Sequence, residues 1–424
     1  MKRVTGTYDV YGDYGYEFRK LEDYLYELAT LYNFEYIKTP ILEESSLYHR
    51  EKNNTNDFIA KHTYDFKDLS GKNMTLRPEC NSGIVRAIME NKLYTELPKK
   101  YYYYGDVFRY DKPQKGRYRE FTQFGFEIIG SENYIVDAEM MSLAYNIYRN
   151  LGVHNITLKL NSLGNSEDIC KYRSQLIKYF SKYIDVMCDD CKRRFRENPL
   201  RILSCKNNDD RKIISNAPSS LDAMSIDSLQ KFQNILKILD IKNVPYKVDK
   251  SFIRGIDYQN DMIFEIINNN NLGSQNDLCG GGRYDNLYLY LTGKKIPAFG
   301  FDFGLERLIT CIKSENSNFF DKKNIDLFIV NIGENLIFCL QLEEILRKNG
   351  IVVDFDMNNR SFKSQLKYSD QFMPKYTLFI GDDEVKTGIL KIRNNKTMEN
   401  FNVNINELLN LFHHDEGKRK CLKK

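Results

Sequence analysis

One short stretch of the chain joins a basic loop to a strand-like segment that ends in an amide and a carboxylate. Residues 109–127 read RYDKPQKGRYREFTQFGFE. Arg117 and Arg119 follow a turn at Gly116, and guanidinium groups suit the paired oxygens of a phosphate. Arg109 ends an apolar strand, where a cation needs an anionic partner. The loop is therefore either a phosphate-binding loop or a solvated charged turn.

The second half of this stretch alternates between apolar and polar side chains. In a strand with a period of two, Phe124 and Phe126 share one face. Gln123, Gly125 and Glu127 share the other face, and the glycine leaves a gap in which a small ligand fits between the amide and the acid. An amphipathic strand with its polar face in water is the alternative.

Further arginines stand beside glycine or proline turns elsewhere in the chain. Arg254 precedes a glycine and shares an expected strand face with Tyr258. Arg77 precedes a proline and Glu79, and Arg307 lies in the first turn of an expected helix. A salt bridge explains each arginine separately, but the whole set favours one polyanionic ligand.

Three other groups of residues predict no specific chemistry. The segment CGGGRYD lacks the Lys-Ser/Thr pair of a P-loop and the spacing of a dinucleotide fingerprint, so its glycines alone do not predict a phosphate-binding nest. The histidines lie away from the motifs above, so a nucleophile–histidine hydrolase is not expected. Cys188, Cys191 and Cys205 fit three ligands of a zinc site, but no fourth ligand is obvious nearby, and free thiols are the alternative. No metal site is predicted.

The hydrophobic periodicity predicts the elements that must position these residues. Residues 16–33 have the spacing of an amphipathic helix, and residues 34–44 follow as an extended segment. Residues 74–91 are expected to form a strand, a turn and a helix. Two strands, at 101–110 and 120–130, then flank the basic loop.

The middle and the C-terminal part of the chain differ in composition. Residues 167–247 are charged, helix-rich and short of glycine, as in an inserted module. Strands are expected again in FIRGIDY and MIFEII, and PAFGFDFGLERLITCI predicts a strand followed by a helix. Polar residues 313–324 predict a linker, and beyond it alternating strands and helices predict an α/β domain with a parallel or mixed sheet.

The overall composition limits the classes of function. The 424 residues have a formal net charge of +4, which permits a nucleic-acid partner only through a local basic surface. No secretory signal is expected at the N-terminus, and no stretch of the sequence is apolar enough to predict a membrane span. Nine cysteines, an odd number, indicate reduced thiols in the cytoplasm.

Taken together, these motifs resemble those of the histidyl-tRNA synthetases, a family of class II aminoacyl-tRNA ligases. RYDKPQKGRYREFTQFGFE resembles the family's motif 2, FGFDFGLERL its motif 3, and KTPILEE, with Pro40, its dimer-forming motif 1. FIRGIDY and GGGRYDNL resemble two segments specific to this family, and CDDCKRRFRENPLRILSCKN resembles part of its insertion. NNRSFKSQLKYSD is similar to part of its anticodon-binding domain.

The resemblance implies a fold and a division of the chain. The implied fold class is α+β, with a class II antiparallel-sheet catalytic core at 1–320 that contains a helical insertion at about 167–247. A C-terminal α/β anticodon-binding domain is expected at 325–413, followed by a basic tail at 414–424.

The resemblance also implies ATP-dependent ligation of histidine to its tRNA through a histidyl-adenylate, with release of AMP and pyrophosphate. The expected partners are ATP with Mg²⁺, histidine, the histidine tRNA and a second copy of the chain in a cytoplasmic homodimer. The implied catalytic residues are Arg254 and Arg109, which stabilise charge on the α-phosphate. The implied ATP-binding residues are Arg109, Arg117, Arg119 and Arg307. The implied amino-acid-binding residues are Glu79, Asn81, Gln123, Glu127, Arg254, Tyr258, Gln259 and Tyr284.

Several positions depart from the family's usual motifs. Asn81 replaces a threonine in R-P-E-G-T, Gln259 replaces a second tyrosine in R-G-L-D-Y-Y, and Asp302 replaces a small residue in motif 3. These departures keep open a specialised paralogue that activates a modified histidine or resists a histidine analogue. A further alternative is a non-catalytic regulatory subunit related to that of ATP phosphoribosyltransferase, which generally lacks the anticodon-binding domain.

Overall fold

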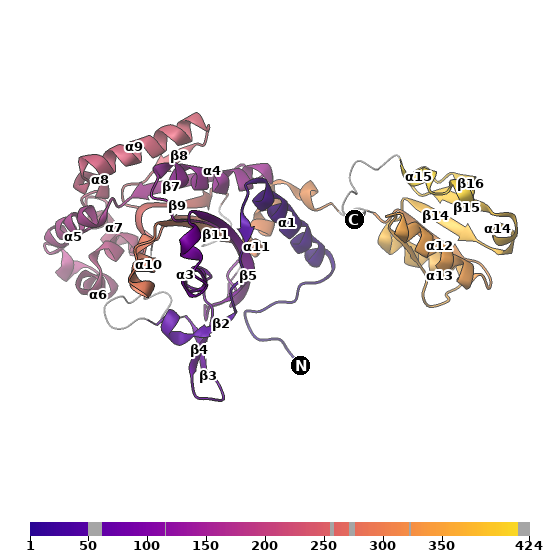
Figure 1. Ribbon diagram of the computed structural model, residues 1–424, viewed down its shortest axis with the longest axis horizontal. Coiled ribbons are helices and arrows are strands. Elements are labelled where there is room, and N and C mark those ends of the chain that lie inside the picture. Colours follow the sequence, from indigo (N-terminus) through magenta and orange to yellow (C-terminus); the bar gives the residue numbers. More distant parts are fainter. Residues whose placement is uncertain (50–61, 115, 255–257, 271–275, 322–323, 414–424) are drawn as a thin grey trace. The chain divides into compact units, whose positions relative to one another are not determined.

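The chain folds into two compact units, Met1–Phe320 and Asp321–Lys424. The structure is a computed structural model that describes residues 1–49, 62–114, 116–254, 258–270, 276–321 and 324–413 (Figure 1). The expected basic tail at 414–424 lies outside the described residues. No helix in the described parts of the chain is long and apolar enough to cross a membrane.

The first unit is built on an eight-stranded, mainly antiparallel sheet, which confirms the expected fold class. The two strands predicted on either side of the basic loop are present, and they pair with each other in antiparallel register. In sheet order the strands are β1 (Glu35–Tyr36), β5 (Lys99–Phe108), β6 (Glu120–Ile129), β11 (Ala298–Gly304), β10 (Asp277–Arg283), β9 (Asn260–Asn268), β7 (Ile156–Ser162) and β8 (Tyr246–Val248). A small second sheet has the order β2 (Leu42–Glu44), β4 (Asn73–Leu76) and β3 (Tyr64–Lys67).

The two faces of the large sheet have different coverings. Phe124 and Phe126 belong to a large core that also contains apolar side chains of α1 (Gly12–Leu31), α4 (Tyr134–Asn150) and α11 (Leu305–Glu315). On the opposite face, α3 (Asn81–Glu90) and α10 (Asp285–Thr292) pack against Tyr101 and Tyr103 of β5. The predicted alternation of β6 is confirmed, because its aromatic side chains are buried beneath helices and its polar side chains lie on the other face.

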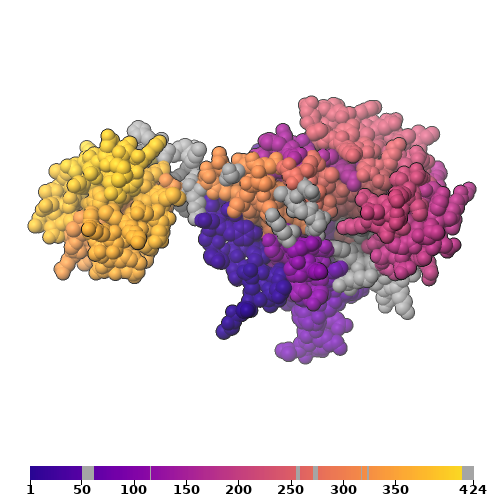
Figure 2. Space-filling view, turned by 180° about the vertical axis from the view of Figure 1, so that it is seen from behind, coloured from indigo at the N-terminus to yellow at the C-terminus, as the bar shows by residue number. Residues whose placement is uncertain are grey.

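The helix-rich segment lies between β7 and β8 and forms a lobe of the first unit (Figure 2). Its last helix packs on α4, because Phe232, Ile235 and Leu239 belong to the main core. The other helices share a small separate core. The helices are α5 (Ser166–Phe180), α6 (Asp189–Glu197), α7 (Asn208–Ile214), α8 (Ser220–Ala223) and α9 (Ile226–Ile241).

Two expectations about local structure are wrong. The described residues of FIRGIDY do not form the expected strand, because residues 252–254 have no regular structure and Tyr258 lies in a turn. Strand β9 begins only at Asn260. A turn precedes this segment, since the Asp249 carboxylate accepts hydrogen bonds from the Ser251 N–H (3.0 Å) and hydroxyl (2.7 Å). Residues 255–257 lie outside the described residues.

The expected linker at 313–324 is also largely structured. Helix α11 continues to Glu315, and a 3-10 helix follows at Ser317–Phe320. Phe320 is buried in the main core. The segment contains an aromatic pair, Phe319 and Phe320, which packs against the main core of the first unit. A prediction made from the polar composition of the segment overlooked this pair.

The second unit contains a five-stranded mixed sheet, as predicted. Its order is β13 (Val353–Phe355), β12 (Leu327–Asn331), β14 (Tyr376–Ile380), β15 (Ile389–Asn394) and β16 (Asn400–Asn404). Its helices are α12 (Leu336–Lys348), α13 (Phe362–Ser369), α14 (Asp382–Thr387) and α15 (Asn410–His413). Helix α12 ends before Gly350, whose φ of 75° is the left-handed conformation expected of a glycine there.

A buried ion pair joins the centre of the large sheet to α4. Arg283 at the end of β10 is 1% exposed and donates from Nε and Nη2 to the Asp137 carboxylate, at 2.9 and 2.6 Å. The same guanidinium donates to the carbonyls of Ser131 and Asn133, at 3.1 and 3.2 Å. These bonds compensate for the desolvation of the cation, so each partner depends on the other.

We expect Asp137→Ala to lower the free energy of unfolding by about 3–5 kcal/mol, because it leaves the Arg283 guanidinium buried without a carboxylate. Chemical denaturation followed by tyrosine fluorescence measures this change. The control is Glu132→Ala, which breaks an ion pair with Lys295 whose two side chains are each 68% exposed. It should cost less than about 1 kcal/mol. Equal effects of the two variants would contradict the assigned role of the buried pair.

Candidate active site

A cavity of about 550 Å³ lies on the open face of the large sheet. Its walls come from β6, β10 and β11, from the loop after β5, from the start of α11 and from the helical insertion. The structure thus brings together residues that are far apart in the sequence. Those among the expected site residues that line it are Glu79, Asn81, Arg109, Arg117, Gln123, Arg254, Tyr258, Gln259, Tyr284 and Arg307.

One end of the cavity holds a cluster of arginines. Arg307 donates from Nε to the carbonyl of Gly116 (2.8 Å) and from Nη1 to the carbonyl of Asp277 (2.6 Å). Burial lowers the pKa of Arg307, and the nearby cations Arg109 and Arg117 lower it further. Guanidinium groups that repel one another in this way favour an anion between them.

Short hydrogen bonds fix the orientation of the other arginines in this cluster. Arg109 donates from Nε to the carbonyl of Pro78 at 2.8 Å, and Arg117 donates from Nε to the Asp111 carboxylate at 2.6 Å. Arg254 lies over β10 at Gly280, where a Cβ atom would stand only 2.5 Å from its guanidinium carbon. The glycine therefore leaves room for the guanidinium against the strand.

Glu127 is fully buried and is not among the residues that line the cavity, but it is hydrogen-bonded to Tyr284, which does line it. The Tyr284 hydroxyl donates to its Oε2 at 2.6 Å, while Oε1 is a buried acceptor with no hydrogen-bond partner in the described part of the chain. A Cβ atom at Gly300 on the adjacent strand would overlap this carboxylate, so the glycine is required. Burial raises the pKa of Glu127 well above its usual value, although the Tyr284 bond opposes the rise. An N–H donor from a ligand would satisfy Oε1.

Further polar groups surround the position next to Glu127. Gln123 donates from Nε2 to Asp302 Oδ1 at 2.9 Å. The Oε1 atoms of Gln123 and Gln259 are also buried acceptors without hydrogen-bond partners among the described residues. Glu79 lies at the same end, where its carboxylate accepts the Asn81 N–H (2.6 Å) and caps the start of α3. This end of the cavity is rich in acceptors, which suits a ligand with several N–H groups.

The expected gap at Gly125 is not open to a ligand. A Cβ atom there would overlap the ring and hydroxyl of Tyr103, which lies opposite Gly125 on β5. The Tyr103 hydroxyl donates to Asn81 Oδ1 at 3.3 Å. The sequence analysis missed Tyr103, although pairing the two predicted strands would have placed it against the glycine.

Other residues of the cavity were missed too, among them His62, Arg201 and Lys206. His62 contradicts the expectation that no histidine lies near the motifs, since its Nδ1 lies 3.0 Å from Asp111 Oδ1 beside the basic loop. Arg201 and Lys206 reach the cavity from the helical insertion. No local signal identified these three, because their positions depend on contacts between distant segments.

Two arginines of the motifs lie elsewhere. Arg119 is not among the residues that line the cavity; its guanidinium lies 4.1 Å from the centre of the Tyr110 ring and donates from Nε to the Asp111 carbonyl at 3.2 Å. Arg77 is buried and donates to the carbonyls of Asp106 and Thr39, both at 2.8 Å. Arg77 therefore joins the end of β4 to neighbouring segments by hydrogen bonds, and it is not part of the arginine cluster.

Comparison with known proteins agrees with this geometry. The family model described as "Histidyl-tRNA synthetase" matches residues 6–308, and that described as "Anticodon binding domain" matches residues 326–414. The chain is 39% identical over 410 residues to the histidine--tRNA ligase of Acholeplasma laidlawii, covering 96% of this chain and 97% of the relative. It is 38% identical over 412 residues to that of Staphylococcus haemolyticus, with coverage of 96% and 97%.

Solved structures give the same result. Apo histidyl-tRNA synthetase of S. aureus superposes with a TM-score of 0.83 and 32% identity, covering 97% of this chain and 99% of that one. A Bacillus halodurans protein titled as an ATP phosphoribosyltransferase regulatory subunit/histidyl-tRNA synthetase has 18% identity and a TM-score of 0.66, with coverage of 89% and 97%, so it shows the fold alone. With its catalytic and anticodon-binding regions both matched, the chain belongs to the histidyl-tRNA synthetase family, as the resemblance of its motifs predicted.

Proposed function

We propose that this chain ligates histidine to its tRNA with ATP, through a histidyl-adenylate. One observation carries the proposal: one cavity has guanidinium groups at one end and, at the other, buried acceptors without hydrogen-bond partners in the described part of the chain. A nucleotide triphosphate complements the first end, and an amino acid with an ammonium and an imidazole complements the second. Family membership supports the same reaction.

The arginines act on the phosphates through fixed charge. Arg109 and Arg254 stabilise the negative charge that develops on the α-phosphate when the carboxylate attacks it and pyrophosphate leaves. Arg117 and Arg307 bind the outer phosphates. Their hydrogen bonds to protein carbonyls and to Asp111 hold them in position before ATP arrives, so little reorganisation accompanies the reaction.

Magnesium reaches the site with ATP as part of the substrate. The carboxylates of Glu265 and Asp277 line the same cavity and are hard oxygen ligands of the kind Mg²⁺ prefers. These acids also offset part of the positive charge of the arginine cluster, as the effect of Asp277 on the pKa of Arg307 indicates.

The acceptor-rich end binds the amino acid. Glu127 accepts an N–H of the imidazole, and Glu79, Gln123 and Asp302 surround the ammonium. Asn81, Gln259 and Asp302, the three departures from the usual motifs, all line this cavity. Their position favours the specialised paralogue as the second candidate, because changes at this end alter the selected side chain without altering phosphate chemistry.

The remaining partners follow from family membership and surface composition. We propose that the second unit binds the anticodon of the histidine tRNA, as its family model suggests. We propose a cytoplasmic location, supported by eight free cysteines among the described residues. A homodimer through β1 and β2 is supported by Tyr36, Ile41 and Leu42, apolar side chains that are 49%, 39% and 49% exposed.

Exchange of pyrophosphate into ATP tests the reaction. We expect histidine to support exchange in the full chain, and Arg254→Ala to reduce it by about 100- to 1,000-fold, because a donor to the transition-state charge is lost. Arg19→Ala, at a side chain 73% exposed on α1, is the matched control and should have no effect. Exchange only with a histidine analogue supports the specialised paralogue. No exchange with either contradicts an active ligase.

Glu127→Gln tests the acceptor end separately. The amide keeps the size of the carboxylate but binds an imidazole N–H less strongly, so the KM for histidine should rise by about 10- to 100-fold while the KM for ATP changes little. Glu120→Gln, on the same strand but outside the cavity, is the control. An unchanged KM for histidine would remove Glu127 from the amino-acid site.

Sedimentation equilibrium tests the dimer. Ile41→Asp combined with Leu42→Asp places two carboxylates on the exposed apolar surface and should shift the particle from twice the chain mass to the mass of one chain. Leu69→Asp changes a more exposed leucine, between β3 and β4, and should leave the dimer intact. A wild-type chain that sediments as a monomer contradicts the proposal.

A further inference from the structure

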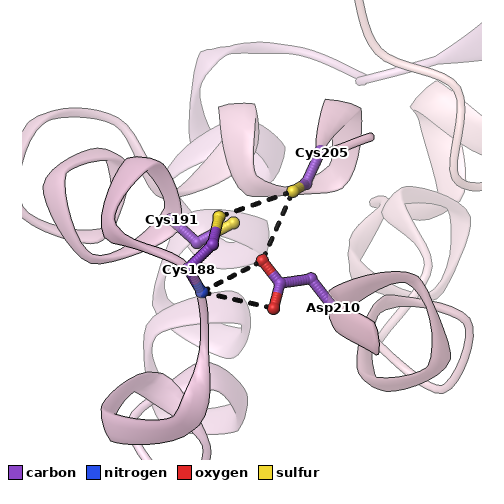
Figure 3. A group of neighbouring side chains, drawn as sticks. All are labelled: Cys188, Cys191, Cys205 and Asp210. Carbon is purple, nitrogen blue, oxygen red and sulfur yellow. Dashed lines mark hydrogen bonds between the residues drawn. The ribbon is translucent and has the colours of Figure 1, made fainter. Parts of the chain in front are cut away.

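Three cysteines and one aspartate meet in the helical insertion, outside the cavity (Figure 3). Cys188 precedes α6, Cys191 lies in its first turn, and Cys205 follows the 3-10 helix at Pro199–Ser204. Asp210 in α7 directs its carboxylate at the thiols. All of these side chains are buried except that of Cys188, which is partly buried.

The distances suit a single tetrahedral ion. The three sulfur atoms and one carboxylate oxygen lie within 4.8 Å of one another. The sulfurs of Cys188 and Cys205 are 3.8 Å apart. Two thiolates bound at about 2.3 Å to a tetrahedral zinc ion have sulfurs about 3.8 Å apart, so this pair already has the separation of two zinc ligands.

Neighbouring groups hold the potential ligands in place. The Cys188 N–H donates to both carboxylate oxygens of Asp210, at 3.3 and 3.2 Å, and the Cys205 thiol donates to Oδ2 at 3.3 Å. The Asn207 N–H donates to the Cys205 sulfur at 3.4 Å, and its side chain caps α7 by accepting the Asp210 N–H. Outer hydrogen bonds of this kind orient metal ligands and stabilise a thiolate.

A disulfide explains this arrangement less well. Its sulfurs would lie about 2.05 Å apart, and it would use only two of the three cysteines. The third thiol and the carboxylate of Asp210, which is 2% exposed, would then remain buried side by side without a cation. A divalent ion accounts for all four residues.

We propose that Cys188, Cys191, Cys205 and Asp210 bind one structural zinc ion. On binding, the three thiols release their protons to solvent, and the charge of the ion offsets the thiolates and the carboxylate. Sulfur ligands in a tetrahedral arrangement select zinc over the oxygen-preferring magnesium. The fourth ligand, Asp210, lies in a separate helix, which is why the sequence analysis predicted no metal site.

The ion would join elements that are too short to be stable separately. Helix α6, the 3-10 helix before Cys205 and α7 contain nine, six and seven residues. Their shared core is small and includes the cysteines themselves. The same elements present Arg201 and Lys206 to the cavity, so zinc would also fix one wall of the proposed active site.

Metal analysis of the full chain tests the site without reference to activity. Protein purified under reducing conditions is expected to contain about one zinc ion per chain. Replacement of zinc by Co²⁺ should give the intense visible bands of a tetrahedral site, together with thiolate-to-cobalt charge-transfer bands. Weak octahedral bands, or a wild-type protein that binds neither metal, would overturn the proposal.

Variants test the individual ligands. Cys205→Ser and Asp210→Asn should each lose most of the bound zinc. In protein loaded with cobalt, the charge-transfer band per bound cobalt should weaken in Cys205→Ser, which removes a thiolate, but not in Asp210→Asn. Cys170→Ser replaces an exposed cysteine on α5 of the same insertion and should retain the metal. Equal zinc content in all three variants, or a Cys188–Cys205 disulfide in the unreduced wild-type protein, would contradict the assignment.

Discussion

Two charged side chains of the site can pack against the central strands only because two strand positions have no side chain. A Cβ atom at Gly300 would overlap the Glu127 carboxylate, and one at Gly280 would meet the Arg254 guanidinium. Glycine weakens a strand, since it loses more conformational freedom and packs no side chain. The stacked phenylalanines on the opposite face, such as Phe301 on β11, offset this cost by burying a large apolar area.

The absence of side chains at Gly300 and Gly280 leaves room for the Glu127 carboxylate and the Arg254 guanidinium. Burial opposes both charged forms, as the raised pKa of Glu127 and the lowered pKa of Arg307 indicate. Protein carbonyls and the Tyr284 hydroxyl compensate in part. A ligand with phosphates at one end and N–H groups at the other completes the compensation. The desolvation that destabilises these charged side chains therefore also makes the site selective for a ligand that pairs with them.

The features predicted correctly from the sequence are those set by neighbouring residues. The alternation of β6 follows from local geometry. The missed features depend on distant pairings: Tyr103 fills the gap at Gly125 because β5 lies beside β6, and Asp210 meets the cysteines only after the insertion folds. FIRGIDY has the composition of a strand, but the turn at Asp249 precedes it, and its described residues, 252–254 and Tyr258, do not form a strand.

Two of the three departures from the expected motifs, Asn81 and Asp302, are hydrogen-bonded within the site, whereas Gln259 Oε1 has no hydrogen-bond partner among the described residues. Asn81 accepts a hydrogen bond from the Tyr103 hydroxyl, and Asp302 accepts one from the Gln123 amide. A site that had lost its phosphate chemistry would no longer need its arginines to be held by fixed carbonyls. Instead the arginine end is complete, and the acceptor end has one additional carboxylate, Asp302. This pattern favours a site whose amino-acid end has been adjusted while its phosphate chemistry has been kept.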